Sequence, residues 1–361
     1  MKKLKKLTAL LTAIGMVAAM SACGSDAASS VTTASTGAAD SAPAATEAAQ
    51  AAEAPAEAGS AAETTAAGDE TYLIGICQLV QHEALDAATQ GFKDALTEKL
   101  GDKVKFDEQN ASGDSANCST IVNGFLSENV NLILANATAP LQAAAAATSD
   151  IPVLGTSVTD YATALEISDW TGTVGTNVSG TSDLAPLDQQ AAMIKELFPD
   201  AKKVGLLYCS AEPNSVYQCD TIEGYLKDEG YEIERYAFTD TNDVTSVTQT
   251  ACDNSDVIYI PTDNTAASNT EAIANVVLPA GVPAVVGEEG ICKGCGVAAL
   301  SISYYDLGYK TGEMAAEILA DGADVSTMPV AFAPNVTKKY NAANCEALGI
   351  TPPDGYEAIA D

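Results

Sequence analysis

Short, continuous apolar runs alternate with longer segments of helical periodicity from Tyr72 onward. Leu73–Ile76 and Leu132–Ala135 are typical apolar runs, and a helical pattern follows each of them. Strands that are apolar on both faces and are separated by amphipathic helices predict a parallel sheet with helices on both sides. We expect strands at residues 73–76, 104–107, 132–135, 151–155, 204–208, 233–238, 257–260 and 282–287, and helices at about 84–100, 119–127, 140–148, 216–228, 265–277 and 304–320.

The same strand pattern occurs twice along the chain. Residues 131–138 resemble residues 256–263, and residues 151–155 resemble residues 282–287, in the same order. Two such matches indicate two copies of one α/β unit, each with its own parallel sheet. In open parallel sheets ligands bind beyond the carboxyl ends of the strands, so two facing lobes predict a ligand cleft between them.

Three segments are expected to join the two lobes. The first is residues 172–183, which are rich in Gly, Thr, Ser and Asn, and the others are residues 297–303 and 328–336. The first lobe is then expected to contain residues 71–182 plus about 301–327. The second lobe is expected to contain residues 183–300 plus about 328–361.

The first 70 residues have a different composition. Four lysines and an apolar run from Leu7 to Met20 are typical of a secretory signal, and the run is shorter than the roughly 20 residues of a membrane span. Because Cys23 follows small residues, the segment resembles a bacterial lipoprotein signal, which implies residues 1–23 as signal with lipidation at Cys23; an ordinary secreted protein with a chance Cys is the alternative. Residues 24–70 are mostly Ala, Ser, Thr, Glu and Pro, which predicts a disordered tether.

Charge narrows the range of partners. The net charge is −32, and residues 71–361 carry 13 Lys or Arg against 41 Asp or Glu, so nucleic acid is excluded as a partner. Arg235 is the single Arg of the chain and His82 the single His. Sites for phosphate, sulfate or dicarboxylates usually present Arg or Lys, so a neutral, zwitterionic or cationic ligand is expected.

Eight Cys remain besides Cys23. An extracytoplasmic chain could pair them as disulfides, but Cys also serves as a small core residue. Cys292 and Cys295 form the one close pair, without a second CxxC or a His cluster that would complete a zinc site. Structural disulfides and free thiols are favoured over a metal or redox role for these Cys, so neither a metal site nor a cofactor is predicted.

Several segments together resemble a known family, the lipid-anchored substrate-binding proteins of ABC transporters with the periplasmic binding protein type I fold. Within it the chain is similar to the tryptophan or tyrosine transporter group. Ser303 is a departure, since Asp is expected there in many relatives, and it leaves the substrate open. The segments that carry the resemblance are residues 75–82, 86–88, 107–111, 151–158, 180–183, 261–264 and 304–308.

The resemblance implies a protein that closes around an amino acid, most of all an aromatic one, and delivers it to ABC permease subunits. The protein would be held on the extracytoplasmic face of the membrane by its lipid, and we expect it to act as a monomer. The alternatives are a branched-chain amino acid, a sugar or a nucleoside as ligand, or a receptor or adhesin role. An enzyme is not expected, because His82 has no nucleophile at motif spacing and no catalytic or phosphate-binding motif is present.

Polar residues at the ends of the expected strands are the candidate ligand-binding residues. Hydroxyls and helix starts could hold a ligand carboxylate, Asp263 or Glu288 could hold an ammonium group, and His82 could form part of an aromatic wall. Helix capping is the alternative role for Asn136, Thr138 and Asp263, and a solvated pair is the alternative for Glu288 with Glu289. The full set is Gln78, His82, Asn136, Ala137, Thr138, Thr156, Ser157, Asn214, Ser215, Asp263, Asn264 and Glu288.

Overall fold

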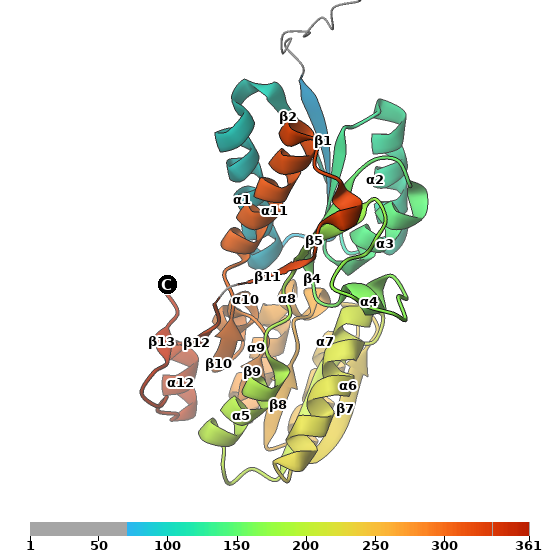
Figure 1. The fold of residues 1–361 in the computed structure, drawn as a ribbon. Helices are drawn as coiled ribbons and strands as arrows, with labels where there is room; N and C mark the ends of the chain where they lie inside the picture. The colour runs from blue at the N-terminus through green and yellow to red at the C-terminus, as the bar shows by residue number, and fades with distance from the viewer. Residues whose placement is uncertain (1–70, 334, 361) are drawn as a thin grey trace, which may run out of the picture. The chain divides into compact units, whose positions relative to one another are not determined.

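The computed structural model describes residues 71–333 and 335–360 (Figure 1). The expected signal, Cys23 and the tether lie outside the described residues. Among residues 71–333 and 335–360, none of the helices has both the length and the apolar character that crossing a bilayer requires.

The first lobe is built on a six-stranded sheet in the order β11-β5-β4-β3-β1-β2, and all its neighbouring strands run parallel. The strands are β1 (Tyr72–Gln78), β2 (Val104–Asn110), β3 (Leu132–Asn136), β4 (Val153–Val158), β5 (Val178–Ser182) and β11 (Ala331–Phe332). The helices are α1 (Glu83–Leu100), α2 (Ser115–Glu128), α3 (Thr138–Ala147), α4 (Tyr161–Ala164) and α11 (Tyr304–Asp321), with 3-10 turns at Gly101–Lys103 and Val325–Thr327.

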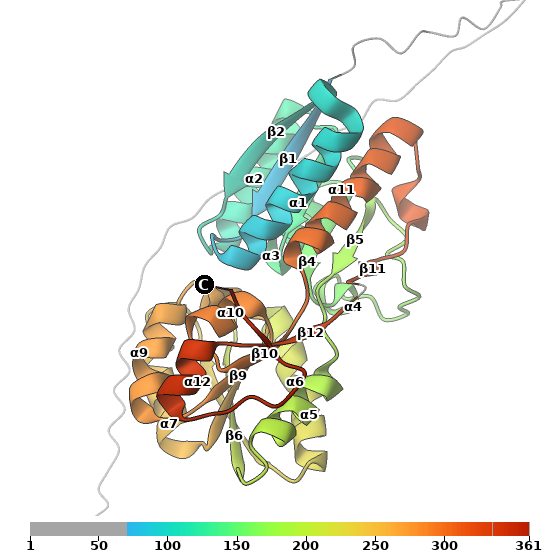
Figure 2. The ribbon, with the colours of Figure 1, turned by 90° about the vertical axis from the view of Figure 1, so that its left-hand side faces the viewer.

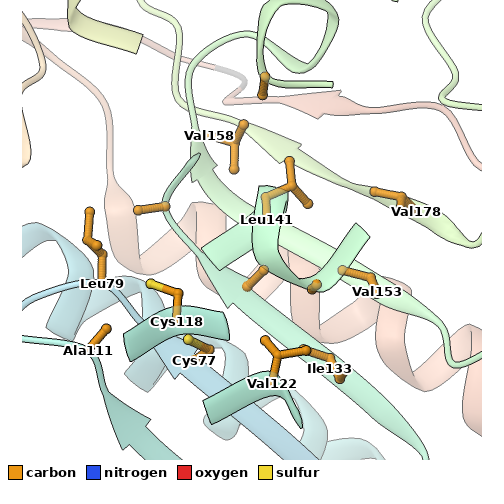
Figure 3. Packing of buried hydrophobic residues seen from close by; sticks show 14 of the residues in the cluster. Cys77, Leu79, Ala111, Cys118, Val122, Ile133, Leu141, Val153, Val158 and Val178 are labelled. Atoms are coloured by element: carbon orange, nitrogen blue, oxygen red, sulfur yellow. The ribbon is translucent and has the colours of Figure 1, made fainter. Parts of the chain in front are cut away.

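Both faces of this sheet are covered, as the continuous apolar strands predict. Ile74 and Ile76 of β1 pack in one cluster with Phe92 of α1 and Met314 of α11. On the other face Ile133 packs with residues of α2 and α3, and Figure 3 shows part of this cluster. Helices α1 and α11 lie side by side in Figures 1 and 2.

The second lobe has a seven-stranded sheet in the order β13-β12-β10-β9-β8-β6-β7, parallel except for the β10–β12 pair. The strands are β6 (Lys203–Cys209), β7 (Glu232–Phe238), β8 (Val257–Ile260), β9 (Ala284–Val286), β10 (Ala298–Ser301), β12 (Thr337–Tyr340) and β13 (Glu357–Ala358). The helices are α5 (Leu187–Leu197), α6 (Pro213–Asp228), α7 (Val244–Asn254), α8 (Asn264–Ala267), α9 (Thr270–Ala280), α10 (Glu289–Gly294) and α12 (Ala342–Leu348). The expected fold class, two parallel-sheet lobes joined by three segments, is confirmed.

The chain passes between the two sheets after β5, after β10 and after β11. The third passage lies beyond the expected boundary near residue 328, because Ala331 and Phe332 still pair with β5 of the first lobe. Likewise the segment at residues 297–303 is mostly strand β10 of the second sheet, and the passage itself is only Ile302 and Ser303. The helix expected at residues 265–277 is two helices, α8 and α9, separated at Ser268 and Asn269.

Close backbone contact fixes α11 against α1. A Cβ atom on Gly308 would lie 1.9 Å from the carbonyl oxygen of Ala88, and one on Gly91 would lie 2.1 Å from the carbonyl oxygen of Tyr305. Only glycine permits this approach. The helix that begins at the second passage is therefore held firmly on the first lobe, with its N-terminus at Tyr304 beside the cleft.

The eight Cys of the described residues are all buried, and none of these eight forms a disulfide in this structure. Cys77 of β1 and Cys118 of α2 lie in the same apolar cluster (Figure 3). Free thiols in the core are therefore the alternative that the structure shows for these residues.

Candidate ligand-binding site

The ends of strands and the starts of helices from both lobes enclose a small cavity, which we call the central cavity. Six of the expected site residues line it: His82, Ser157, Asn214, Asp263, Asn264 and Glu288. The rest of its lining is Ala84, Leu85, Thr159, Asp183, Thr262, Ala267 and Tyr304. No Lys or Arg of the described residues is part of this lining.

The other expected site residues lie outside the lining, and two of them, Asn136 and Gln78, form hydrogen bonds to α1. Asn136 donates from Nδ2 to the carbonyl oxygen of Leu85 at 2.8 Å and to Thr89 Oγ1 at 2.9 Å. Gln78 accepts from Thr89 Oγ1 at 2.6 Å and donates to Asp86 at 2.7 Å. These bonds hold the first turns of α1 against β1 and β3.

The remaining expected residues are also buried within their own lobes. Thr156 accepts a hydrogen bond from Thr181 Oγ1 at 3.3 Å, and Ser215 accepts one from Asn214 at 3.3 Å. Ala137 precedes α3 with a φ of 104°, and Thr138 begins that helix. The structure thus places six of the twelve expected residues in the lining of the central cavity and the other six in the interior of the lobes, outside that lining.

Asp263 and Glu288 cap helices of the second lobe. Asp263 accepts hydrogen bonds from the backbone N–H groups of Ala266 at 2.8 Å and Cys209 at 2.6 Å. Glu288 accepts from the N–H groups of Gly290 at 2.6 Å and Ile291 at 2.5 Å. Burial and the nearby Glu212 carboxylate raise the pKa of Asp263 to about 8, and burial raises the pKa of Glu288 to about 7. All four carboxylate oxygens therefore already have backbone partners.

Asp183, which follows β5, is different. It is 4% exposed, and its Oδ2 accepts a hydrogen bond from the Tyr304 hydroxyl at 2.9 Å. Its Oδ1 is buried and has no partner among the described residues. Burial raises the pKa of Asp183, as expected for a carboxylate that lacks full solvation. This oxygen is an open acceptor in the wall of the central cavity.

Ser157 supplies an open hydroxyl in the same cavity. It is 6% exposed, and its Oγ has no hydrogen-bond partner in the described part of the chain. Its φ of 55° lies in the left-handed region, which a non-glycine residue adopts at a cost of about 1–3 kcal/mol and which often occurs at functional sites. We call Asp183 Oδ1 and Ser157 Oγ the open pair. Asn136 Oδ1 is a further buried atom of this kind, but it lies outside the central cavity.

The first turn of α1 also faces this cavity, through Ala84 and Leu85. His82 precedes the helix, and no side chain of residues 71–333 or 335–360 caps it. The N–H groups of a first helical turn lack partners within the helix and favour an anion. An open acceptor, an open hydroxyl and a helix start therefore converge on one cavity, which suits a ligand with a positive and a negative pole.

One hydrogen bond joins the lobes across the cleft. His82 Nε2 lies 3.2 Å from Asn264 Oδ1, and Glu212 fixes Asn264 by accepting from its backbone N–H at 3.0 Å and from its Nδ2 at 2.8 Å. Burial lowers the pKa of His82, which favours the neutral ring. Glu83 and Lys293 form a longer pair, 3.6 Å apart, at the solvent edge.

The central cavity is small in this arrangement, at about 10 Å³. This is about the volume that one water molecule needs. The central cavity by itself therefore does not hold a whole ligand of amino-acid size.

Asp183 is not among the site residues that the sequence predicts. Asp183 directly follows the buried strand β5, much as Asp263 lies three residues after β8, and Asp183 ends one of the segments that resemble the transporter family. The same reasoning that selected Asp263 could therefore have selected it. The Tyr304 hydroxyl that bonds to Asp183 comes from 121 residues further along the chain, so the local sequence gives no signal for this contact.

Two parallel-sheet lobes, three connecting segments and a buried polar cleft define a two-lobed solute-binding protein. A family model described as ABC transporter substrate binding protein matches residues 73–361, and the chain belongs to this family. The resemblance found in the sequence is confirmed. Both the family and the fold are those of binding proteins rather than enzymes.

Similar proteins include amino-acid binders. A tyrosine-binding protein of Clostridioides difficile (strain R20291) is 38% identical over 260 residues, which are 71% of this chain and 75% of that protein. An ABC domain in complex with L-Trp from Streptococcus pneumonia is 31% identical, with 80% of this chain and 100% of that chain covered and a TM-score of 0.76.

A third relative was solved in a ligand-free, open state. This substrate-binding protein with adhesive properties from Clostridium difficile is 36% identical, with 80% of this chain and 99% of that chain covered, but its TM-score is only 0.62. The structure is therefore more similar to the Trp complex than to the open protein, although its sequence identity to the open protein is higher. This agrees with the contact between His82 and Asn264 across the cleft.

Proposed function

We propose that this protein captures a zwitterionic aromatic amino acid, tyrosine or tryptophan, and delivers it to the permease of an ABC importer. The observation that carries the proposal is the open pair in a cavity lined without Lys or Arg among the described residues. A buried acceptor and a buried hydroxyl without partners are costly unless a ligand satisfies them. The relatives that bind tyrosine and L-Trp support the ligand class.

The two poles of the ligand have distinct partners in this proposal. The ammonium group donates to Asp183 Oδ1, and a charge-assisted hydrogen bond of this kind is about twice as strong as a neutral one. The carboxylate accepts from Ser157 Oγ and from the N–H groups at the start of α1. Closure of the second lobe then covers the ligand, and the bond between His82 and Asn264 helps to hold the closed form.

Calorimetric titration of the purified full chain with a panel of amino acids, sugars and nucleosides tests the ligand. Tyrosine or tryptophan should bind, and Asp183→Asn should weaken that binding by about 30-fold or more, since the loss of a charged hydrogen bond costs about 2 kcal/mol. Asp188→Asn, an exposed residue at the start of α5, is the matched control and should bind as the wild type does. If no amino acid binds the wild type, the proposal is wrong.

The location is part of the same proposal. Lipidation of Cys23 would hold the protein on the extracytoplasmic face of the membrane, with residues 24–70 as a tether to the binding lobes. Cys23→Ser should abolish incorporation of a labelled fatty acid and move the protein out of the membrane fraction. Labelling that persists in this variant would contradict the anchor. Cys252→Ser, a buried thiol of α7, is the control and should stay lipidated.

A further inference from the structure

A second cavity, which we call the side cavity, adjoins the central cavity. Its volume is about 320 Å³, and it shares Ala84, Glu288 and Tyr304 with the central cavity. Tyr304 connects the two directly, because its hydroxyl group bonds to Asp183 and its side chain also lines the side cavity. A ligand held by Asp183 would therefore lie beside Tyr304, whose side chain also lines the side cavity.

Part of the wall of the side cavity is apolar. Ala84 and Ala87 come from the first turns of α1, Ile302 comes from the second passage between the lobes, and Tyr304 begins α11. These residues belong to one apolar cluster. Apolar walls with an aromatic ring among them suit the ring of a ligand.

Polar groups occupy another part of the lining. Ser301 Oγ is 3.5 Å from Glu289 Oε2 in this lining. The other charged or hydroxyl-bearing residues of the lining, besides the two tyrosines, are Glu83, Glu288, Ser303, Thr337 and Lys339. Glu289 is half-buried and starts α10. A carboxylate accepts hydrogen bonds but cannot donate when ionised, so it would favour a ring with an O–H or N–H group.

Two other cavities touch the central cavity, and both are less suited to a ring. One is lined by Gln81, Glu83, Ser268 and Lys293, and the other by Asp114, Glu212 and Asp240 together with several hydroxyl residues. In both, polar atoms make up a larger share of the wall surface than they do in the side cavity. Burial of an aromatic ring against them would leave those polar groups without water.

We propose that the side cavity is the side-chain subsite of the ligand, with the ring against Ala87 and Ile302 and with Glu289 as acceptor for a donor on the ring. This inference rests on the proposed function and deepens it. It predicts that the site selects aromatic amino acids whose ring carries a hydrogen-bond donor. Phenylalanine, which lacks that donor, would leave Glu289 without its partner.

Titration of the full chain with tyrosine and phenylalanine tests the subsite. Ala87→Phe fills the side cavity and should weaken tyrosine binding at least tenfold. Ala201→Phe is the matched control and should bind tyrosine like the wild type. Ala201 lines a separate cavity of about 450 Å³ in the second lobe, formed by residues 197–201, 256, 257, 281, 283, 348 and 350. Tyrosine affinity in Ala87→Phe within twofold of the wild type would overturn the subsite.

Glu289→Ala tests the acceptor without any filling of the cavity. In the wild type tyrosine should bind at least tenfold more tightly than phenylalanine, and in Glu289→Ala this ratio should fall below about threefold. An unchanged ratio in a variant with wild-type melting temperature would overturn the role of Glu289. If the wild type binds no amino acid, the proposed function itself fails, whereas normal tyrosine binding by both variants removes only the subsite.

Discussion

The two lobes present helix starts to the same cleft but satisfy them differently. In the second lobe Asp263 and Glu288 accept backbone N–H groups with every carboxylate oxygen. In the first lobe α1 has no side-chain cap from the described residues, and the open pair lies beside it. Polar groups that the fold already satisfies stabilise the fold, and those it leaves open are available to a ligand. We therefore assign ligand binding mainly to the first lobe and closure to the second.

The largest effects are expected for substitutions of Asp183 and Asp263, one on ligand affinity and the other on stability. Asp183→Asn should lower ligand affinity by about 30-fold or more and leave the free energy of unfolding within about 0.5 kcal/mol. Asp263→Asn should lower the free energy of unfolding by about 2 kcal/mol, since a buried cap weakens, and change affinity less than threefold. Calorimetry and urea unfolding measure the two quantities. Equal effects of both substitutions on affinity would remove the contrast between the lobes.

Stability should fall as pH rises from about 5 to about 8. The pKa of Glu288 is raised to about 7 and that of Asp263 to about 8, both above their ordinary values near 4. The folded protein therefore binds more protons than the unfolded chain in this range, and its free energy of unfolding declines until both groups ionise. Urea unfolding at a series of pH values measures this slope.

Comparison of the pH dependence of stability in wild type and Glu288→Gln separates the contribution of this carboxyl group from that of the other acidic groups. The slope between pH 5 and pH 7 should be shallower in the variant, because one protonation site is gone. Glu271→Gln, at the start of α9 on the same lobe, is the control and should keep the wild-type slope. A steeper or unchanged slope in Glu288→Gln would mean that this carboxylate does not hold its proton in the fold.

The bond across the cleft should have a moderate effect. His82→Ala and Asn264→Ala should each weaken ligand binding about three- to tenfold, because the closed form loses about 1 kcal/mol. The double variant should lose little more than either single one, since both remove the same bond. If the losses in binding free energy of the two single variants add up in the double variant, the two residues act separately.

The smallest effect is expected at the solvent edge. Lys293→Ala removes the pair with Glu83, whose side chain is 61% exposed, and exposed pairs contribute less than about 1 kcal/mol. Affinity at 0.15 M salt should change less than twofold, and any change should shrink further at 1 M salt. A larger loss that persists at high salt would mean that this edge takes part in closure.

The local pattern of apolar and polar residues was sufficient to predict the overall architecture. The alternation of apolar strands and amphipathic helices, and its repetition, predicted two parallel-sheet lobes because burial imposes those periodicities directly on the sequence. Short elements were harder: β11 has two residues, too few for any periodicity, and its pairing with Thr181 and Ser182 depends on chain that lies about 150 residues away. Helices α5 and α7 were not expected either, although their apolar positions follow helical spacing.

The candidate site was predictable in its location and only partly in its residues. Strand ends are visible in the sequence, so the central cavity was expected at the right edge of both sheets. Asn136 and Gln78 also follow strands, but the packing of α1 turns them toward Thr89 instead of the cavity. Which way a polar side chain at a strand end bonds depends on the helix that covers it.

By itself the sequence determined the class of this protein: two α/β lobes, a cleft poor in cations, and a family. Only the tertiary structure decided which carboxylate is available. Asp183 and Asp263 have similar local contexts, since Asp183 directly follows β5 and Asp263 lies three residues after β8. Asp263 accepts from two backbone N–H groups, while Asp183 interacts with side-chain hydroxyls, of which that of Tyr304 lies 121 residues away. The reason is physical: a side chain's availability is set by which donors the fold brings to it, and those donors come from distant parts of the chain.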